Sequence, residues 1–258
     1  MQKSVGIAAV VVLIGGGLAA YYFMRGEAPP PPPPPPPRIA RDPVPAPVSA
    51  QPIRHPLSGV TGKDLPAAEQ SDGPMLQSLG ELLGRKWLVY IVGDGLIHRI
   101  VATVDNLPRD RLPADAMPFK RVPKAFVTTG KGATLAIGPR NSARYAAYVS
   151  LAESIDAAKL ASVYVRFYPL FQHAYEELGH PKAYFNDRLV VAIDDLLAAP
   201  ELAGPVKLVK PMLHYEFADP ALEARSAGQK IMIRVGNDNA ARLKAKLREI
   251  RKLVASGG

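Results

Sequence analysis

Polar side chains that could form a ligand site occur in two stretches of the chain. The first stretch follows one apolar segment, and the second opens a later one. Carboxylate, amide and guanidinium groups together can hold a carboxylate or a sugar by directional hydrogen bonds. A helix cap plus a salt bridge is the alternative for residues 186–188. The predicted ligand-binding cluster is Asp105, Asn106, Arg109, Tyr184, Asn186, Asp187 and Arg188.

The chain lacks the motifs of familiar catalytic sites. G-x-S-x-G, the Walker A pattern, H-E-x-x-H and paired C-x-x-C do not occur. Asp105, Asp187 or Glu216 could act as acid or base in a hydrolase of a cell-wall polymer, unless they lie apart or are engaged elsewhere. Asp194 and Asp195 are adjacent, about 100° apart on a helix, so they cannot face each other. We therefore predict no catalytic residue, and an enzyme stays the alternative.

Histidines and carboxylates also occur at a spacing that metals use. His173 and Glu177 lie four residues apart on one expected helix, with Glu176 between them and His180 beyond its end. Zinc and iron sites use such ligands. Because Gly179 ends the helix, His180 need not face the others. We predict neither a metal nor another cofactor.

The last helix is strongly basic and could contact an anionic surface such as acidic lipid. It has no interleaved aromatic residues on which bases could stack, so nucleic acid is not an expected partner. A solvated basic face is the alternative. The predicted anionic-surface residues are Arg242, Lys244, Lys246, Arg248, Arg251 and Lys252.

The net charge of +9 is unevenly distributed. Residues 1–24 carry +1, residues 25–63 carry +3 and residues 240–258 carry +5. Residues 64–239 hold 20 basic and 20 acidic side chains. The positive field is therefore expected in the N-terminal region and the last helix, around a neutral body.

An uncharged apolar run, Val5–Met24, predicts an N-terminal transmembrane anchor. Twenty helical residues span about 30 Å, the thickness of the hydrocarbon core of a bilayer. The alternative is a signal peptide cleaved after Ala20. The aromatic residues that end the run favour retention, because they suit the membrane interface. The chain has no cysteine, which excludes a lipidated cysteine anchor.

Nine consecutive prolines, Pro29–Pro37, predict a stalk after the anchor. In the polyproline II conformation they would span about 28 Å. The residues that follow are poor in large apolar side chains and are expected to remain unfolded. The alternative role is a proline-rich ligand for an aromatic groove. The predicted domains are an anchor at 1–24, a proline-rich linker at 25–71 and one globular domain at 72–258.

The short leader before the anchor favours insertion with the N-terminus in the cytoplasm. We therefore expect a single-pass inner-membrane protein whose C-terminal domain lies in the periplasm. With no catalytic pattern, the expected function is a binding or scaffold module for an unknown envelope protein or polymer. A cytoplasm-facing tether that uses Arg242–Lys252 is the remaining alternative.

Hydrophobic periodicity predicts an α+β domain that is predominantly helical, with a small β-hairpin or sheet. Expected caps are Asp72, Asp94, Asn141 and Asp219. Trp87–Val92 is a compact apolar run. Leu96–Leu107 fits either a strand or a helix, and we favour a helix that Pro108 ends. The other expected helices are 75–83, 141–152, 155–178 with a kink at Pro169, 186–199, 220–235 and 240–254, and the expected extended segments are 125–129, 134–137 and 206–217.

Several strings resemble motifs of a bacterial family called domain of unknown function 3014. The resemblance covers about Met75–Val254 and implies an N-terminal membrane segment and a proline-rich linker, but no known activity. The strings that carry it are Val104-Asp105-Asn106-Leu107-Pro108-Arg109, Tyr168-Pro169-Leu170-Phe171-Gln172, Ala174-Tyr175-Glu176-Glu177-Leu178-Gly179, Tyr184-Phe185-Asn186-Asp187-Arg188-Leu189, Tyr215-Glu216-Phe217-Ala218-Asp219-Pro220 and Ser226-Ala227-Gly228-Gln229-Lys230.

Overall fold

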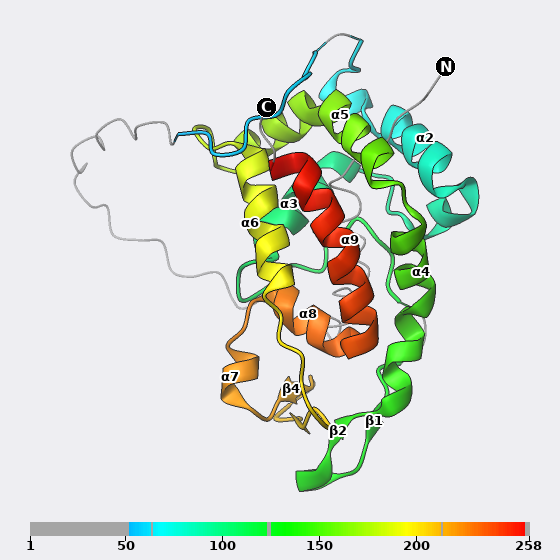
Figure 1. Ribbon diagram of the computed structural model, residues 1–258, viewed down its shortest axis with the longest axis vertical. Coiled ribbons are helices and arrows are strands. Elements are labelled where there is room, and N and C mark those ends of the chain that lie inside the picture. Colours follow the sequence, from blue (N-terminus) through cyan, green and yellow to red (C-terminus); the bar gives the residue numbers. More distant parts are fainter. Residues whose placement is uncertain (1–51, 63, 123–124, 213, 256–258) are drawn as a thin grey trace, which may run out of the picture.

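A computed structural model describes residues 52–62, 64–122, 125–212 and 214–255 of the protein. Helices dominate the described part, as the periodicity predicted (Figure 1). The α-helices are α2 (Asp72–Leu83), α3 (Leu96–Asn106), α4 (Ala146–Ser154), α5 (Ala157–Glu177), α6 (Phe185–Leu197), α7 (Pro220–Glu223), α8 (Ala227–Val235) and α9 (Asn237–Ala255). Short 3-10 helices are η1 (Ala68–Gln70), η2 (Arg85–Tyr90), η3 (Gly132–Thr134) and η4 (Pro139–Tyr145).

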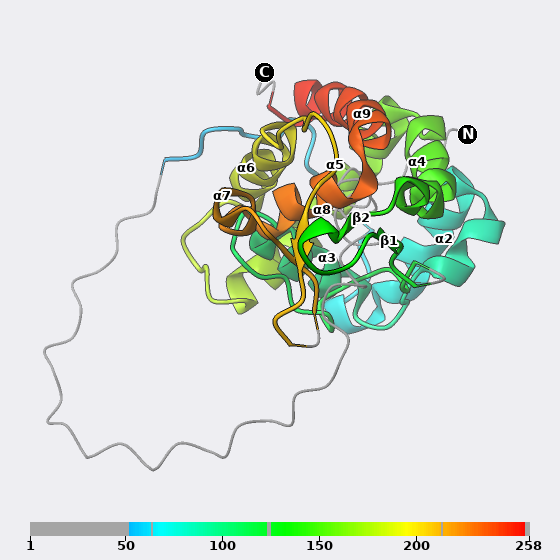
Figure 2. The same cartoon turned by 90° about the horizontal axis from the view of Figure 1, so that it is seen from below.

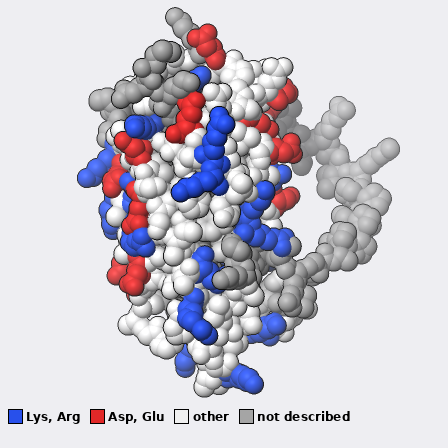
Figure 3. All heavy atoms as spheres, turned by 90° about the vertical axis from the view of Figure 1, so that its right-hand side faces the viewer, with Lys and Arg blue, Asp and Glu red and all other residues white. Residues whose placement is uncertain are grey.

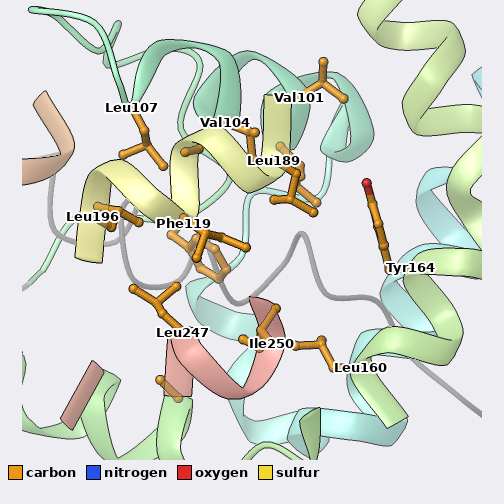
Figure 4. Packing of buried hydrophobic residues seen from close by; sticks show 14 of the residues in the cluster. Val101, Val104, Leu107, Phe119, Leu160, Tyr164, Leu189, Leu196, Leu247 and Ile250 are labelled. Atoms are coloured by element: carbon orange, nitrogen blue, oxygen red, sulfur yellow. The ribbon is translucent and has the colours of Figure 1, made fainter. Parts of the chain in front are cut away.

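Helix α9 lies at the centre of the packing. It contacts α4, α5, α6 and α8, while α3 packs on the opposite side of α6 and on α5. The stripe predicted on α9 is buried, because Leu243, Leu247 and Ile250 all face this core. Figure 4 shows side chains of α3, α5, α6 and α9 converging with Phe119 from the proline-rich loop. Burial of these side chains holds the helices together.

Two short antiparallel hairpins lie at one end of the molecule. Strands β1 (Thr128–Thr129) and β2 (Ala136–Ile137) form the first, and β3 (Leu208–Val209) and β4 (Glu216–Phe217) form the second. A single bridge between Ala136 and Lys207 joins them, so the segment 206–217 extends the first hairpin as predicted. A small cluster that includes Phe126, Leu208, Phe217 and Ile233 packs the hairpins onto α8.

Three of the predicted caps prove to be wrong: Asp94 does not cap α3, whose N-cap is Gly95, and Asp72 and Asn141 bond outside their own segments. Asp72 lies inside α2, and its carboxylate accepts hydrogen bonds from the backbone N–H groups of Gly95 and Leu96, 2.8 Å away. It therefore caps the start of α3 from a neighbouring helix, where Asp94 was expected. Asn141 lies inside η4, and α4 begins only at Ala146. The errors at Asp72 and Asn141 arise because a side chain can bond outside its own segment.

The other local predictions divide between confirmation and correction. Leu96–Leu107 forms the helix α3, and Asp219 caps α7 by accepting from the N–H of Ala221. The helix expected from 220 to 235 is wrong, because it divides into α7 and α8. Ser226 starts α8 as its own N-cap, accepting from the N–H of Gln229. The apolar run after Arg85 forms η2 and a bridge between Ile91 and Phe119.

The folded body begins before residue 72. Leu57, Val60 and Leu65 pack against the main core, so part of the segment assigned to the linker contacts the domain. Within the described ranges, no helix has the length and apolar character needed to cross a bilayer. The predicted anchor Val5–Met24 and the proline block Pro29–Pro37 lie outside the described residues.

Candidate functional site

The start of α6 and the end of α3 bring six members of the predicted cluster together in two separate groups. In the first group, Asp105 is buried between two arginines. Its carboxylate lies 2.5 Å from the Arg109 guanidinium and 2.9 Å from Nε of Arg188. Both guanidinium groups also donate to the main-chain oxygen of Asp105. The carboxylate is thus neutralised by two fixed cations from α6 and the loop after α3.

Two aromatic rings close this buried group. The Nε2 atom of His180 lies 3.5 Å from the Asp105 carboxylate, and the imidazole stacks on Tyr175 with 4.4 Å between ring centroids. Burial, reinforced by the charge of Asp105, raises the pKa of Tyr175. Asn106 takes no part, because its amide donates to the carbonyl of Ala102 within α3. These contacts hold α3 against α6. They also occupy the Asp105 carboxylate, which a hydrolase would need as its acid or base.

The second group holds the beginning of the described chain. The Asp187 carboxylate, in the first turn of α6, accepts from the N–H of Arg54 at 3.0 Å and from the N–H of His55 at 2.8 Å. The Tyr184 hydroxyl accepts from the N–H of Leu57 at 3.2 Å. We call Tyr184, Asn186 and Asp187 the clasp. It binds residues 54–57 of its own chain through their main-chain groups.

Asn186 is the most deeply buried member of the clasp. Its Nδ2 donates to the carbonyls of His55 and Val254, each at 2.8 Å. Its Oδ1 accepts from the Tyr164 hydroxyl at 3.1 Å. Burial raises the pKa of Tyr164, so this phenol remains a neutral donor. One amide therefore ties the incoming segment, α5 and the last turn of α9 together.

The basic residues of α9 serve mainly to hold neighbouring helices. Lys244 and Lys246 are buried, and their ammonium groups donate to Ala199 O at 2.6 Å and Ile155 O at 2.9 Å, just beyond the ends of α6 and α4. Arg251 pairs with Asp194 at 2.5 Å. Cations at helix C-termini satisfy carbonyls that lack an intrahelical partner.

The other three residues of the predicted basic surface differ from these. Arg242 binds Glu153 with its Nε 2.8 Å from Oε1, and this hydrogen bond lowers the pKa of Glu153. Arg248 and Lys252 are exposed. The six residues therefore do not form one solvent-facing stripe, because Lys244 and Lys246 point into the protein.

The histidines and glutamates of α5 also separate. The Glu177 carboxylate lies 2.8 Å from Nε2 of His98 in α3 and 3.4 Å from Nε2 of His173. All three side chains lie near the surface. His180 instead faces Asp105. Across the described ranges, no three His, Cys, Asp or Glu residues are placed to hold a metal ion.

The hairpin end carries a concentration of positive charge that the division of the sequence into long segments concealed. Residues 116–152 contain six Lys or Arg and no Asp or Glu, and residues 202–215 add Lys207 and Lys210 without an acid. Figure 3 shows blue side chains reaching the lower end of the molecule, while red ones gather higher on that face. The neutral body is therefore polarised, with its positive field over the hairpins.

A hollow of about 710 Å³ lies beside the hairpins. The β1–β2 hairpin, η4 and the first turn of α9 line it. The side chains of Asn237 and Asn239 bond main-chain carbonyls of Leu202 and Ser142, and Arg242 binds Glu153. These bonds fix the walls of the hollow. The outer surface of the hairpins is more open than the hollow.

The sequence reasoning missed the partner of the clasp. Residues 54–57 carry no motif, and their contribution is made by main-chain groups that any residue except proline can supply. Leu57 and Val60 were the available signal, because they are isolated apolar residues in a proline-rich stretch. The polar start of α6 was selected as part of a ligand site, and the bonding partners that the structure gives it lie in this chain.

Comparison with known proteins assigns the chain to a family. The sequence model described as "Protein of unknown function (DUF3014)" matches residues 96–251, and the chain belongs to this family. No curated protein matches the chain. No solved structure matches it either.

Proposed function

We propose that this DUF3014 protein is a single-pass membrane protein that presents a binding or scaffold domain on a polyproline stalk. The apolar run Val5–Met24 supports the anchor, and Pro29–Pro37 supports the stalk. The fold contributes a fixed point of attachment. The domain lies in the periplasm in this proposal, and its partner is an envelope protein or polymer.

The observation that carries the proposal is the clasp. The segment at residues 54–57, which lies inside the predicted linker and after the proline block, is bonded to the start of α6 and, through Asn186, to the end of α9. His55 Nδ1 lies 3.3 Å from Ala255 O, which places the segment at the last turn of α9. Helix α9 has 19 residues, so its other end is about 27 Å away. A stalk that enters there leaves the hairpin end free to meet a partner.

The enzyme alternative receives no support from two of the three carboxylates that it would use; the third, Glu216, is half-buried in β4 opposite Val209. Asp105 is held by Arg109 and Arg188, and Asp187 is bonded to backbone N–H groups of the incoming segment. A general acid or base needs a carboxyl that can exchange a proton with a substrate. Both groups are instead committed to holding elements together.

Reporter fusions after Gly258 test the membrane topology. Alkaline phosphatase should be active there and green fluorescent protein dark, because only the former folds productively outside the cytoplasm. The reverse pattern would remove the periplasmic placement. If alkaline carbonate without detergent extracts the full chain from membranes, the proposed membrane anchor is wrong.

Photo-crosslinking in cells tests the binding role. A photoreactive residue at Val209 on the hairpin end should capture a partner, whereas the same residue at Arg166 on α5 should not. Equal capture from both positions, or capture from Arg166 alone, would contradict presentation of the hairpin end.

A further inference from the structure

The register of the small sheet brings both hairpin loops to one edge. Thr129 pairs with Ala136, and Ala136 bridges Lys207 in antiparallel fashion. The N–H of Leu208 bonds the carbonyl of Leu135, so the chain enters β3 moving toward the 130–135 turn. Gly130 forms that turn with a φ of +73°. The loop after Val209 therefore leaves the sheet on the same side as Lys131, although Figure 2 shows the two hairpins diverging.

The β3–β4 hairpin exposes apolar and basic side chains together. Met212 is 80% exposed and Val209 is 43% exposed. Lys207 is also exposed, and the Lys210 ammonium lies 5.4 Å from the centre of the Tyr215 ring. The buried face of the hairpin is formed by other residues, which pack on α8. The outward side chains of Lys207, Val209 and Met212 are not part of this buried cluster.

We propose that the β3–β4 hairpin docks on an anionic phospholipid bilayer. Met212 and Val209 enter the interfacial region, and Lys207 and Lys210 contact the headgroups. Lysine suits this position because its aliphatic stem lies along apolar surface while the ammonium stays with the headgroups. The hairpin carries one carboxylate, Glu216, which lies opposite Val209 in the pairing.

The exposed apolar residues favour lipid over a soluble polyanion. A polysaccharide or an acidic peptide needs only the lysines, and it gives an exposed methionine no apolar environment. Nucleic acid would require aromatic rings open to stacking, yet Phe126 and Tyr145 of this region are buried, and the half-buried Tyr215 packs on the hairpin cluster with its ring centre 5.8 Å from that of Phe126. A bilayer surface matches both features, because it combines negative headgroups with an apolar interior.

The position of the clasp indicates which bilayer is contacted. The stalk joins the domain at the last turn of α9, while the first turn of α9 lies beside the hairpins. The hairpin end therefore points away from the membrane that holds the anchor. The inferred partner is a second, apposed bilayer, and this direction rests on the proposed function.

The test uses the full chain and two vesicle populations. Donor vesicles of phosphatidylcholine carry the protein, and fluorescent acceptor vesicles contain phosphatidylglycerol. We expect the donors to capture anionic acceptors and not acceptors of pure phosphatidylcholine. Lys207→Gln with Lys210→Gln should reduce capture about 25-fold, because each lysine near an anionic surface contributes about fivefold. Met212→Ser should reduce it roughly tenfold.

Matched variants elsewhere separate docking from general charge. Lys86→Gln with Lys159→Gln makes the same change in net charge on exposed residues, and Val89→Ser removes an apolar side chain that is 60% exposed. Both should leave capture unchanged. Loss in these controls equal to that in the hairpin variants would overturn the proposal. The proposal would also be overturned if soluble polyglutamate, and not lipid, abolished capture.

The anchor and the docking surface fail in distinguishable ways. If the chain does not enter the donor vesicles, flotation of the free protein with the anionic acceptors still measures the hairpin directly. Binding there that depends on Lys207, Lys210 and Met212 would keep the docking surface and remove the anchor. Absence of binding in both formats would reject the docking surface.

Discussion

The two ends of α9 use polar side chains in opposite ways. At its last turn, the clasp directs Asn186 and Asp187 inward, onto main-chain groups of residues 54–57 and of α9 itself. At its first turn, the hairpins direct Lys131, Lys207 and Lys210 outward into solvent. The clasp end therefore fixes geometry, whereas the hairpin end is available for contact.

This contrast also separates stability from recognition. A buried polar group that loses its partner costs free energy of unfolding, whereas an exposed lysine contributes little to it. Substitutions around the start of α6 should therefore lower stability, and substitutions on the hairpins should change only binding. The predictions below follow that order, from the largest effect on stability to the smallest.

Asp105→Asn should have the largest effect. It leaves the partly buried Arg188 without its carboxylate, and breaking a buried ion pair from one side costs about 3 kcal/mol at the lower end of its usual range. Urea unfolding followed by circular dichroism measures the change. A decrease of less than about 1 kcal/mol would mean that the group behaves as a surface ion pair.

Asn186→Ala should lower the free energy of unfolding by about 2–3 kcal/mol, because it orphans two carbonyls and the Tyr164 hydroxyl. Asn106→Ala is the matched control, since that amide makes one bond within α3. The control should cost about 1 kcal/mol or less. Equal costs would show that the clasp contributes no more than an ordinary side-chain bond.

Lys244→Met should cost about 1–2 kcal/mol. The methionine retains the apolar stem but loses the bond to Ala199 O at the end of α6. Arg248→Met, on the exposed face of the same helix, should be nearly neutral. Thermal unfolding compares the two variants. A larger loss of stability in Arg248→Met than in Lys244→Met would indicate that Lys244 belongs to the predicted anionic surface.

Lys207→Gln with Lys210→Gln should change the free energy of unfolding by less than about 0.5 kcal/mol, because both lysines are exposed. The same urea titration measures it. A loss comparable to that of Asn186→Ala would contradict the division between a structural end and a presenting end.

The pH dependence of stability gives the smallest effect. Hydrogen bonding from Arg242 lowers the pKa of Glu153 below its ordinary value of 4.5. A lowered folded-state pKa contributes stability above the ordinary value, and this contribution is lost as the pH falls through the lowered value. Glu153→Gln should therefore narrow the difference in melting temperature between neutral pH and acid. An unchanged difference would show that solvent screens the pair completely.

The sequence predicted the long helices well because their periodicity is set by one core. The stripes of α5 and α9 are buried as expected, and the motifs placed the chain in its family. Asp72 and Asn141 could not be assigned correctly, because their bonding partners are distant in the sequence. Lys244 and Lys246 were taken for surface cations for the same reason, since only the packing of α4 and α6 against α9 reveals their carbonyl partners.

The structure gives internal partners to most of the residues that were predicted to bind a ligand. Six of the seven polar residues chosen from the sequence do take part in buried or partly buried networks, but in two groups with different partners. The separation follows from main-chain acceptors and donors, which leave no trace in residue type. The charge of the hairpin end was readable from the sequence and became visible only when the counting window matched the folded unit.

Hydrogen exchange at residues 54–57 tests the central claim most directly, because the claim is that this segment, which follows the predicted stalk, is held against the domain. The amides of Arg54, His55 and Leu57 donate to Asp187 and Tyr184. We predict slow exchange at all three in the full chain, and fast exchange at Arg54 and His55 in Asp187→Ala while the amides of α3 stay protected. Exchange of these amides in the unaltered protein at the rate of an unstructured peptide would contradict the account.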